Sequence, residues 1–516
     1  MLSLSQLHFS ETKRLINKVD KDDLVSWLLK DGYFPEQYVL PPCFSVEQFK
    51  LKDVPYYPVR HNKLQPTPAD LLNVSFPKSM LTDRIFGIIE PKIYHDIVWH
   101  LSNEFDFVLS RLFDSDTHFY CYSFPIPVNR SIEGELGKLR SGRMIYEFIE
   151  MAENDLVADA HNYQYVVHTD IKNFYPSVYT HSLAWALHDK ETARADKFIF
   201  DLLGTKLDKL FQNSNDGCTN GLAIGPALSD LASEILLAAV DKKCSQELAG
   251  TDFLGVRFKD DYRVLCNDRN DADKVIKALQ RQMRYYNLFL NEGKTTIKEL
   301  PDGLYRAWIL EYQPISLKSE QTISYKVFES TLLAVLEIDR KYPDTGIIDK
   351  FLGELVTKDY KLKLVLQTKQ ILKTLSLLFL LKKRRAKAFP QILAIIELLI
   401  LKLGENTELK QTILDDVSKH FRDSFDYLYD GLWIYYFLKV NGRDIPTTVE
   451  LDKNPLFHSI RTNTQEFFNN GLDIHLFKAV EVAGNKSLAE HLDIFPKDGA
   501  YRLTAVSREE RQEDQK

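Results

Sequence analysis

The distribution of glycine is the feature that most constrains the architecture of this chain. Between residues 327 and 403 the only glycines are Gly346 and Gly353, and leucine, isoleucine and lysine recur there at helical spacing. Before this stretch, apolar strand-like runs alternate with helical patterns, which is typical of α/β layers. We therefore predict an α/β (α+β) part followed by an all-α part, with several stacked helices between residues 331 and 438.

The length of 516 residues is sufficient for about three domains. We place an N-terminal segment at 1–75, the α/β part at 76–325 and the helical part at 326–505. The remaining residues, 506–516, are almost all polar, and we expect them to be disordered. No clean sequence period supports an assignment of repeats.

The composition excludes several classes of protein. With 66 basic and 73 acidic residues, the net charge of −7 argues against indiscriminate binding of nucleic acid, although a local basic cleft remains compatible. The five scattered cysteines form no C-x-x-C pair, which is typical of reduced thiols. Residues 1–18 lack the apolar core of a signal peptide, and the apolar stretch 392–403 is too short to span a membrane. We expect a cytoplasmic protein without a membrane partner.

Two adjacent acids stand between two runs of β-type residues. Residues 253–258 (FLGVRF) precede Asp260 and Asp261, and residues 262–266 (YRVLC) follow them. This pattern predicts a β-hairpin with acids at its turn. Two other Asp-Asp pairs lie in helical sequence, where the helix dipole or solvation explains them. Acids are common in turns, so the hairpin alone fits either a metal site or an ordinary turn.

A further acid stands at the end of a predicted strand. Residues 165–169 (YVVHT) have strand character, Asp170 follows, and residues 172–176 (KNFYP) turn the chain away. Carboxylates at a strand end and a neighbouring hairpin can converge on two divalent ions, which activate an attacking hydroxyl and stabilise leaving pyrophosphate. The alternative is an aspartate that caps the next turn.

Two other segments have weaker signals. Gly221 and Gly225 open a helical pattern over residues 221–240, and they either let the backbone approach a flat or charged ligand or simply begin the helix. Lys294 follows a strand-like run and either meets phosphate and donates a proton to pyrophosphate, or lies in solvent.

The order of these four segments favours the functional interpretations. They read D-x-x-x-F-Y from Asp170, G-L-x-x-G-x-x-L-S from Gly221, F-x-D-D from Phe258, and L-N-x-x-K-T from Leu290. The series resembles motifs A, B, C and D of the reverse transcriptase palm, in that order. Residues 76–94 look like the fingers of the same family. The resemblance implies nucleotidyl transfer from dNTPs with two Mg²⁺ or Mn²⁺ ions.

The resemblance also implies the metal ligands. Asp170 and Asp260 match the two metal-binding aspartates, and Asp261 matches the second acid of the hairpin. The backbone carbonyl of Ile171 would complete the shell of the first metal.

Other roles follow for the nucleotide. Tyr175 matches the aromatic steric gate that excludes a 2′-hydroxyl, Lys294 matches the motif D lysine, and Gly225 lies in the nucleotide-binding loop of motif B. A basic group lies where the fingers supply triphosphate contacts, unless it is a solvated loop: Arg130, Lys138, Arg140 and Arg143.

Motifs B and C depart from the family pattern. Lys259 stands where the family has a small apolar residue, so we expect a charge near the metals or the primer end that contacts DNA. Ala223-Ile224 replace the usual Pro-Gln, and that glutamine positions the template–nucleotide pair. Faithful templating is therefore in doubt. After Thr295 a long helical region takes the place of a recognisable primer grip and thumb.

This combination resembles the abortive-infection (Abi) reverse transcriptases of bacterial phage defence, the AbiK-like group. Residues 173–175 (NFY), 179–182 (YTHS) with Trp185, and 431–437 (GLWIYYF) carry the likeness. Proteins of this group join a palm to a C-terminal helical, HEAT-like domain and form homo-oligomers. They make single-stranded DNA without a template, covalently attached to a hydroxyl of the protein. Two tyrosines in an irregular stretch are candidates for that hydroxyl, or else pack ordinarily: Tyr33 and Tyr38.

Two alternative functions remain open. One is a templated reverse transcriptase that copies a bound RNA, and the other is a catalytically silent helical scaffold or phage sensor. Within the helical part a basic run either forms a groove for the growing strand or is a solvated turn between helices. Its members are Lys382, Lys383, Arg384 and Arg385.

Overall fold

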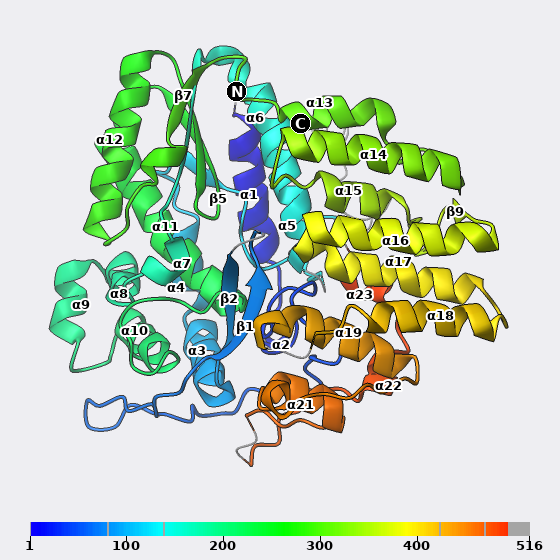
Figure 1. Cartoon of the computed structure of the whole chain (residues 1–516). Coiled ribbons are helices and arrows are strands. Elements are labelled where there is room, and N and C mark those ends of the chain that lie inside the picture. Colours follow the sequence, from blue (N-terminus) through cyan, green and yellow to red (C-terminus); the bar gives the residue numbers. More distant parts are fainter. Residues whose placement is uncertain (1, 80–81, 138–139, 423–424, 469–470, 494–516) are drawn as a thin grey trace. The chain divides into compact units, whose positions relative to one another are not determined.

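The computed structural model describes residues 2–79, 82–137, 140–422, 425–468 and 471–493 (Figure 1). The chain groups into two compact units. The first contains the residues up to Pro35, Phe49–Asn73 and Gly87–Tyr305. The second contains Glu36–Gln48, Val74–Phe86 and the residues from Arg306 on. Parts of the predicted N-terminal segment thus contribute to both units, and the predicted tail lies outside the described residues.

A five-stranded sheet of order β3-β5-β6-β4-β7 forms the centre of the first unit. β4 (Tyr165–Asp170) lies antiparallel to both β6 (Asp261–Cys266) and β7 (Thr296–Glu299). β5 (Phe253–Phe258) pairs antiparallel with β6 and parallel with β3 (Phe119–Cys121). The strand that ends at Asp170 and the hairpin that carries the paired acids are both confirmed.

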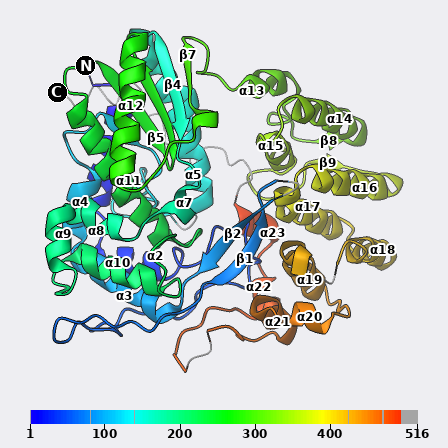
Figure 2. The same ribbon diagram turned by 60° about the vertical axis from the view of Figure 1, so that its left-hand side comes forward.

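Two helices cover the face of this sheet that presents Arg257 and Tyr262. They are α11 (Ala227–Glu247) and α12 (Arg269–Tyr285), which lie beside the strands in both views (Figures 1 and 2). The side chain of Asp241 on α11 bonds to both Arg257 and Tyr262, which fixes the helix to the strands. Gly255 on β5 leaves space for a neighbour, because an added Cβ would lie 2.2 Å from the ring of Phe119.

Two boundaries differ from the sequence predictions. α11 begins at Ala227 rather than at Gly221, because Gly221 and Gly225 have φ angles of 95° and 124°, which an α-helix excludes. The β-type run of residues 120–128 (YCYSFPIPV) predicts a strand that ends at prolines, but the observed strand is only β3, because the prolines that follow cannot donate ladder hydrogen bonds.

Shorter helices surround the sheet in the first unit. Residues 21–29 (KDDLVSWLL), with acids in the first turn, predict a capped helix start, and α2 confirms it, since the Asp20 side chain accepts from the Asp22 N–H at 2.8 Å. The helices are α1 (Leu4–Ile16), α2 (Lys21–Leu29), α3 (Pro91–Asn103), α4 (Phe105–Leu112), α5 (Arg140–Ile149), α6 (Leu156–Asp159), α7 (Phe174–Ser177), α8 (His181–His188), α9 (Lys190–Asp196) and α10 (Leu203–Asn213).

The sequence of residues 81–112 has apolar residues at helical spacing and predicts helices from residue 81 on, but a hairpin replaces the start of this pattern. β1 (Leu72–Pro77) and β2 (Asp83–Ile88) pair in a two-stranded sheet. The helix begins only at Pro91, where the Glu90 side chain caps the backbone N–H groups of the first turn. The prediction was wrong because the apolar residues of β2 also fit a helical period.

The second unit is mainly helical, as the sequence predicts for residues 331–438. The helices from α13 to α19 pack in a series in which α13 contacts α14, α14 contacts α15, α17 contacts α15, α16 and α19, and α18 contacts α19 (Figure 1). The helices are α13 (Ala307–Tyr312), α14 (Tyr325–Lys341), α15 (Ile347–Glu354), α16 (Thr368–Arg384), α17 (Phe389–Lys402), α18 (Thr407–Ser418), α19 (Leu428–Val440), α20 (Val449–Asp452), α21 (Pro455–Thr462), α22 (Val480–Ala483) and α23 (Leu488–Leu492), with a small pair β8 (Ile323–Ser324) and β9 (Leu364–Val365).

The longest apolar stretch of the sequence forms α17 in the core of this unit, where most of its side chains are buried. This confirms the prediction of a buried helix. Among the described residues, none of the helices combines the length and the apolar character that crossing a bilayer requires.

Candidate functional site

Strand pairing brings the predicted acids together at one end of the central sheet. In the register of β4 and β6, Asp170 lies directly opposite Asp261. Asp260 immediately precedes Asp261, in the turn of the β5–β6 hairpin. The fold therefore places acids from two distant parts of the sequence side by side.

These acids form a strongly anionic cluster. Asp170 Oδ1 is buried and has no hydrogen-bond partner among the described residues, whereas its Oδ2 accepts from Lys294 Nζ. Burial raises the pKa of Asp261 to about 6; Arg263 opposes this shift, and Asp260 and Asp170 add to it. Such crowding of carboxylates favours either protonation or a bound cation.

The chemistry of the donors fits hard divalent cations. Among the residues described, no group of three His, Cys, Asp or Glu side chains already has the geometry of a metal site. The unpartnered oxygen of Asp170 and the adjacent hairpin carboxylates are nevertheless the ligand type that Mg²⁺ prefers. Ile171, predicted to add its carbonyl, is buried and forms an isolated bridge with Leu290. Lys294 supplies the positive charge at Asp170 in this structure.

Backbone hydrogen bonds place Lys294 beside the acids. The Asn291 N–H donates to the Asp170 carbonyl at 2.8 Å, and the Lys172 N–H donates to the Phe289 carbonyl at 2.8 Å. A short 3₁₀ turn, Glu292–Lys294, then directs the lysine toward β4. The hydrogen bond to Asp170 raises the pKa of Lys294, so the ammonium keeps a proton available for transfer.

Asp230, on the first turn of α11, connects three of the motif segments. Its buried carboxylate accepts a short hydrogen bond from the Tyr175 hydroxyl, and Lys259 Nζ lies 3.5 Å from the same oxygen. Burial first, and then the charge of Asp230, raise the pKa of Tyr175, so the phenol stays neutral. The side chain of Lys259 thus reaches the Tyr175–Asp230 pair, and its contact with DNA near the metals or the primer end stays a prediction.

The loop of residues 221–226 is fixed to the segment that carries Tyr175. The Leu222 N–H donates to the Tyr175 carbonyl at 3.0 Å, and the Gly221 N–H donates to the Val178 carbonyl at 2.8 Å. The Ile224 carbonyl accepts from the Gly87 N–H at 3.0 Å. The positive φ of Gly225 lets the loop turn into α11.

A fully buried charge network supports the hairpin from the other face of the sheet. Arg257 is 1% exposed; its Nε lies 2.9 Å from Asp241 and its Nη1 lies 2.9 Å from Glu234. The same Nη1 donates to the Lys259 carbonyl at 3.1 Å, and the Lys259 N–H donates to Ser123 Oγ at 2.6 Å. These bonds hold Lys259 in a left-handed conformation with φ of 51°, and so fix the turn that presents Asp260.

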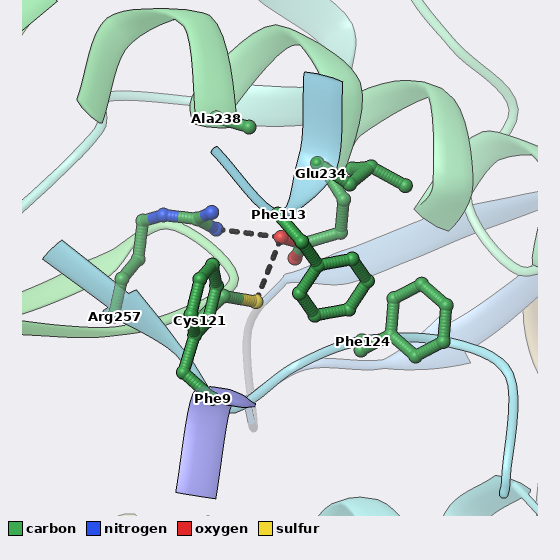
Figure 3. Close-up of a pocket in the computed structure, with 8 residues that line it drawn as sticks. Phe9, Phe113, Cys121, Phe124, Glu234, Ala238 and Arg257 are labelled. Carbon is green, nitrogen blue, oxygen red and sulfur yellow. Dashed lines mark hydrogen bonds and ion pairs between the residues drawn. The ribbon is translucent and has the colours of Figure 1, made fainter. Parts of the chain in front are cut away.

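Figure 3 shows the part of this network around Glu234, where the Cys121 thiol donates to the carboxylate at 3.0 Å. The adjacent cavity, lined by Phe9 and Phe113, holds only about 10 Å³, which is at most one water molecule. It is a packing gap and not a ligand site. The sequence analysis did not single out Arg257 and Glu234. An arginine inside an otherwise apolar strand nevertheless indicates a buried charge that needs an acidic partner.

Comparison with known families agrees with this geometry. Residues 125–325 match the model of the family described as Reverse transcriptase (RNA-dependent DNA polymerase). These residues form a reverse transcriptase domain. It includes Asp170, both hairpin acids and Lys294. No curated protein matches the chain significantly.

Two telomerase structures are among the solved structures that resemble the chain. The structure of Candida albicans telomerase with a TWJ fragment of telomeric RNA is 16% identical, with a TM-score of 0.26. The match covers 70% of this chain and 66% of that one, slightly less than two thirds of its length. Apo telomerase from Candida tropicalis is 12% identical with a TM-score of 0.30, over 71% of this chain and 70% of that one. Similarities this low carry no argument about the chain.

The basic residues predicted for the triphosphate are only partly described. Arg130 is largely buried in the reverse transcriptase domain, and its Nη2 lies 3.7 Å from Glu147. Lys138 lies outside the described residues. Arg140 and Arg143 belong to α5, but their side chains are also outside the description. A triphosphate contact from this group stays a prediction.

The basic run of the second unit is mostly engaged in ion pairs. It lies at the C-terminal end of α16 and just beyond it, where cations interact favourably with the helix dipole. The pairs are Lys382 with Asp430, Arg384 with Asp339 and Arg385 with Asp349, while Lys383 is exposed. These contacts favour the interpretation as a junction between helices over a groove for DNA.

The two tyrosines proposed as primers are both packed. Tyr33 is fully buried, and its hydroxyl donates to the Ile89 carbonyl at 2.7 Å. That placement contradicts the requirement for a mobile hydroxyl. In the second unit the ring of Tyr38 packs on Phe76, and its carbonyl accepts from the Tyr429 hydroxyl at 2.9 Å. Ordinary packing therefore accounts for both residues.

Proposed function

We propose that this chain is a nucleotidyltransferase that synthesises DNA from dNTPs with two bound Mg²⁺ or Mn²⁺ ions. The observation that carries the proposal is the pairing of Asp170 with Asp261 across β4 and β6, together with a buried oxygen of Asp170 that has no hydrogen-bond partner among the described residues. Two ions bound by Asp170 and Asp260 would activate the attacking hydroxyl and stabilise pyrophosphate. Asp261 would add negative charge at the same point.

Three other residues act on the nucleotide in this proposal. Lys294 is protonated beside Asp170 and can donate its proton to the leaving pyrophosphate. Tyr175 excludes a 2′-hydroxyl with its ring, which the bond to Asp230 holds in one position. Gly225 lets the backbone of the loop before α11 approach the nucleotide.

We further propose that synthesis is protein-primed and template-independent, and that it serves abortive-infection phage defence in the cytoplasm of a bacterial cell. The apolar Ile224 in the place of a glutamine supports this version, because it cannot hydrogen-bond a template–nucleotide pair through its side chain. A primer hydroxyl on the protein needs no separate binding energy. The product is then a covalently held single strand, and the working form is a homo-oligomer with a HEAT-like helical domain.

A templated enzyme that copies RNA is the second candidate. The description of the matching family as an RNA-dependent DNA polymerase favours it. The two versions differ in what they need besides dNTPs, so one assay separates them.

The test uses purified full-length protein, Mg²⁺ or Mn²⁺ and one labelled dNTP at a time. We expect label to stay on the polypeptide through boiling in SDS, to be released by proteinase, and to require no template. The Asp260→Asn variant is the control and should incorporate nothing. Label found only in free DNA, and only with added primer–template, would contradict protein priming and support the templated enzyme.

A further inference from the structure

A proline-rich segment of the first unit forms an anchored arm with an exposed tip. The arm comprises residues 49–70, and it extends beyond α3 as a blue loop in Figures 1 and 2. Asp96 holds its base, because the carboxylate accepts from the Tyr56 and Tyr57 N–H groups at 2.8 and 2.7 Å. His95 accepts from the Lys52 N–H at 2.9 Å.

The buried pair His95–Asp96 makes this base rigid. Both side chains are fully buried, and His95 Nδ1 lies 2.8 Å from Asp96. Because the Nε2 atom accepts a backbone hydrogen bond, the ring proton resides on Nδ1 and is donated to Asp96. At the other end of the arm, the Ala69 N–H donates to the Asn213 carbonyl at 2.9 Å. The buried His95–Asp96 pair thus holds an arm whose tip is exposed.

The tip of the arm is a tight two-residue turn. Arg60 and Lys63 exchange both backbone hydrogen bonds at 3.0 Å, and His61 and Asn62 between them have φ angles of 49° and 58°. All four side chains are exposed. In the part of the chain that the structure describes, Arg60, His61 and Lys63 form no ion pair.

Beside the tip lies a hollow of about 630 Å³. Its lining includes the rings of Tyr56 and Tyr57, Pro58, and the side chains of Arg60, His61 and Lys63, and no residue that lines it is acidic. Lys52 lies 3.9 Å from the centroid of the Tyr56 ring, which adds a further positive charge. In a chain with net charge −7, this is a local concentration of cations beside aromatic rings.

We propose that this hollow binds single-stranded nucleic acid. Aromatic rings stack on unpaired bases, and arginine and lysine neutralise the phosphates between them. Burial raises the pKa of Tyr57, which keeps its ring a neutral stacking surface. The volume accommodates about one or two nucleotides, by comparison with the 300–1,000 Å³ of small-molecule pockets. Duplexes bind less well, because their bases are already stacked and paired.

The test measures binding of labelled oligo-dT and oligo-rU to the full chain by fluorescence anisotropy. The Asp260→Asn variant without dNTPs is used as the parent, so that the result does not depend on the polymerase proposal. Arg60→Ala with Lys63→Ala should weaken binding at least tenfold. If both contact phosphate, the slope of log affinity against log salt should fall by about 1.4, since each contact on a single strand contributes about 0.7.

A matched control distinguishes binding at this hollow from a general effect of the net charge on affinity. Lys277→Ala with Arg284→Ala removes the same charge from the exposed surface of α12 in the same unit, and should change the affinity less than twofold. Tyr57→Ala should cost about five- to 150-fold, the range for one stacked base, whereas Tyr57→Phe should bind like the parent. Equal affinity for dT and rU is expected. Equal losses from both charge-removing pairs, unchanged binding by Tyr57→Ala, or preference for duplex would each overturn the proposal.

Discussion

The β5–β6 hairpin lies between two clusters of charged side chains. The clusters differ in burial and in how far protein partners satisfy their charges. Behind the hairpin, Arg257 lies between Glu234 and Asp241, all three buried and mutually hydrogen-bonded or ion-paired. At its tip, Asp260 and Asp261 crowd against Asp170; Asp170 accepts from the Lys294 ammonium, and Arg263 lies 3.9 Å from Asp261. The two clusters are joined by one strand and one turn.

The difference indicates that the cluster around Arg257 has a structural role and that the acid cluster has a functional one. Buried charges persist only when partners satisfy them, and the network around Arg257 meets that condition and fixes the turn at Lys259. The acid cluster does not meet it, because one oxygen of Asp170 has no partner in the part of the chain that the structure describes, and Asp261 has a raised pKa. Strain of this kind is typical of a functional site, and a bound cation would relieve it.

The strongest test removes ligand charge from the acid cluster. Asp170→Asn or Asp260→Asn keeps the side-chain shape, so we expect nucleotide incorporation to fall by several orders of magnitude. The melting temperature should stay the same or rise, because a repulsive carboxylate is lost. Incorporation of labelled dNTP and thermal unfolding measure the two effects. Full activity of Asp260→Asn would refute the assignment of the site.

The next largest effect is expected from the buried network of Arg257, Glu234 and Asp241, and it should appear as a loss of unfolding free energy. Arg257→Met leaves Glu234 and Asp241 buried without their cation, which should cost about 3–5 kcal/mol of unfolding free energy. Arg269→Met is the matched control, because its ion pair with Asp273 is exposed and should contribute less than about 1 kcal/mol. Denaturant unfolding measures both. Equal stabilities would show that the network does not hold the fold.

A third prediction addresses Tyr175, which lies between the two clusters. Tyr175→Ala opens space beside the sugar, so the preference for dNTPs over rNTPs should drop by about 1–3 kcal/mol, or tens- to hundreds-fold. Tyr175→Phe keeps the ring and loses only the bond to Asp230, and should retain most of the preference. The ratio of kcat/KM values for dNTP and rNTP measures this. An unchanged ratio in Tyr175→Ala would make the residue core packing.

The acid cluster could be predicted from the sequence because its signals are local. A strand ending at Asp170 and a hairpin around Asp260 follow from alternating and apolar patterns, and strand pairing then brings them together. The hairpin β1–β2 was misjudged because its short apolar run fits two periods. Boundaries such as the start of α11 depend on backbone angles at Gly221 and Gly225 that a helical pattern does not reveal.

The buried network around Arg257 could not be predicted, because its contacts join residues from different segments of the sequence. Nothing near Arg257 indicates that Glu234 and Asp241 on α11 will meet it, and nothing near Asp230 indicates Tyr175. The sequence left two interpretations of the basic residues at the end of α16 open for the same reason. Their partners lie on other helices, and only the fold shows that most of these cations are already neutralised.

The smallest expected effect concerns Lys259, and it decides whether the side chain contacts Asp230 or faces the acid cluster. Its Nζ lies 3.5 Å from Asp230, farther than Arg257 lies from its acids, and Asp230 also accepts from the Tyr175 hydroxyl, so Lys259→Met should cost less stability than Arg257→Met. If the side chain stays with Asp230, the Mg²⁺ concentration that gives half-maximal incorporation should not change. A lysine that faced the acids would compete with the cation, and its removal would lower that concentration.

Lys294→Met provides the comparison for this measurement. Its ammonium contacts Asp170 directly, so removing it should let Mg²⁺ bind at lower concentration even as the rate falls through loss of the proton donor. The half-maximal Mg²⁺ concentration should therefore shift several-fold in Lys294→Met and remain at the wild-type value in Lys259→Met. Matching shifts in the two variants would place Lys259 in the acid cluster and support the prediction made from the sequence.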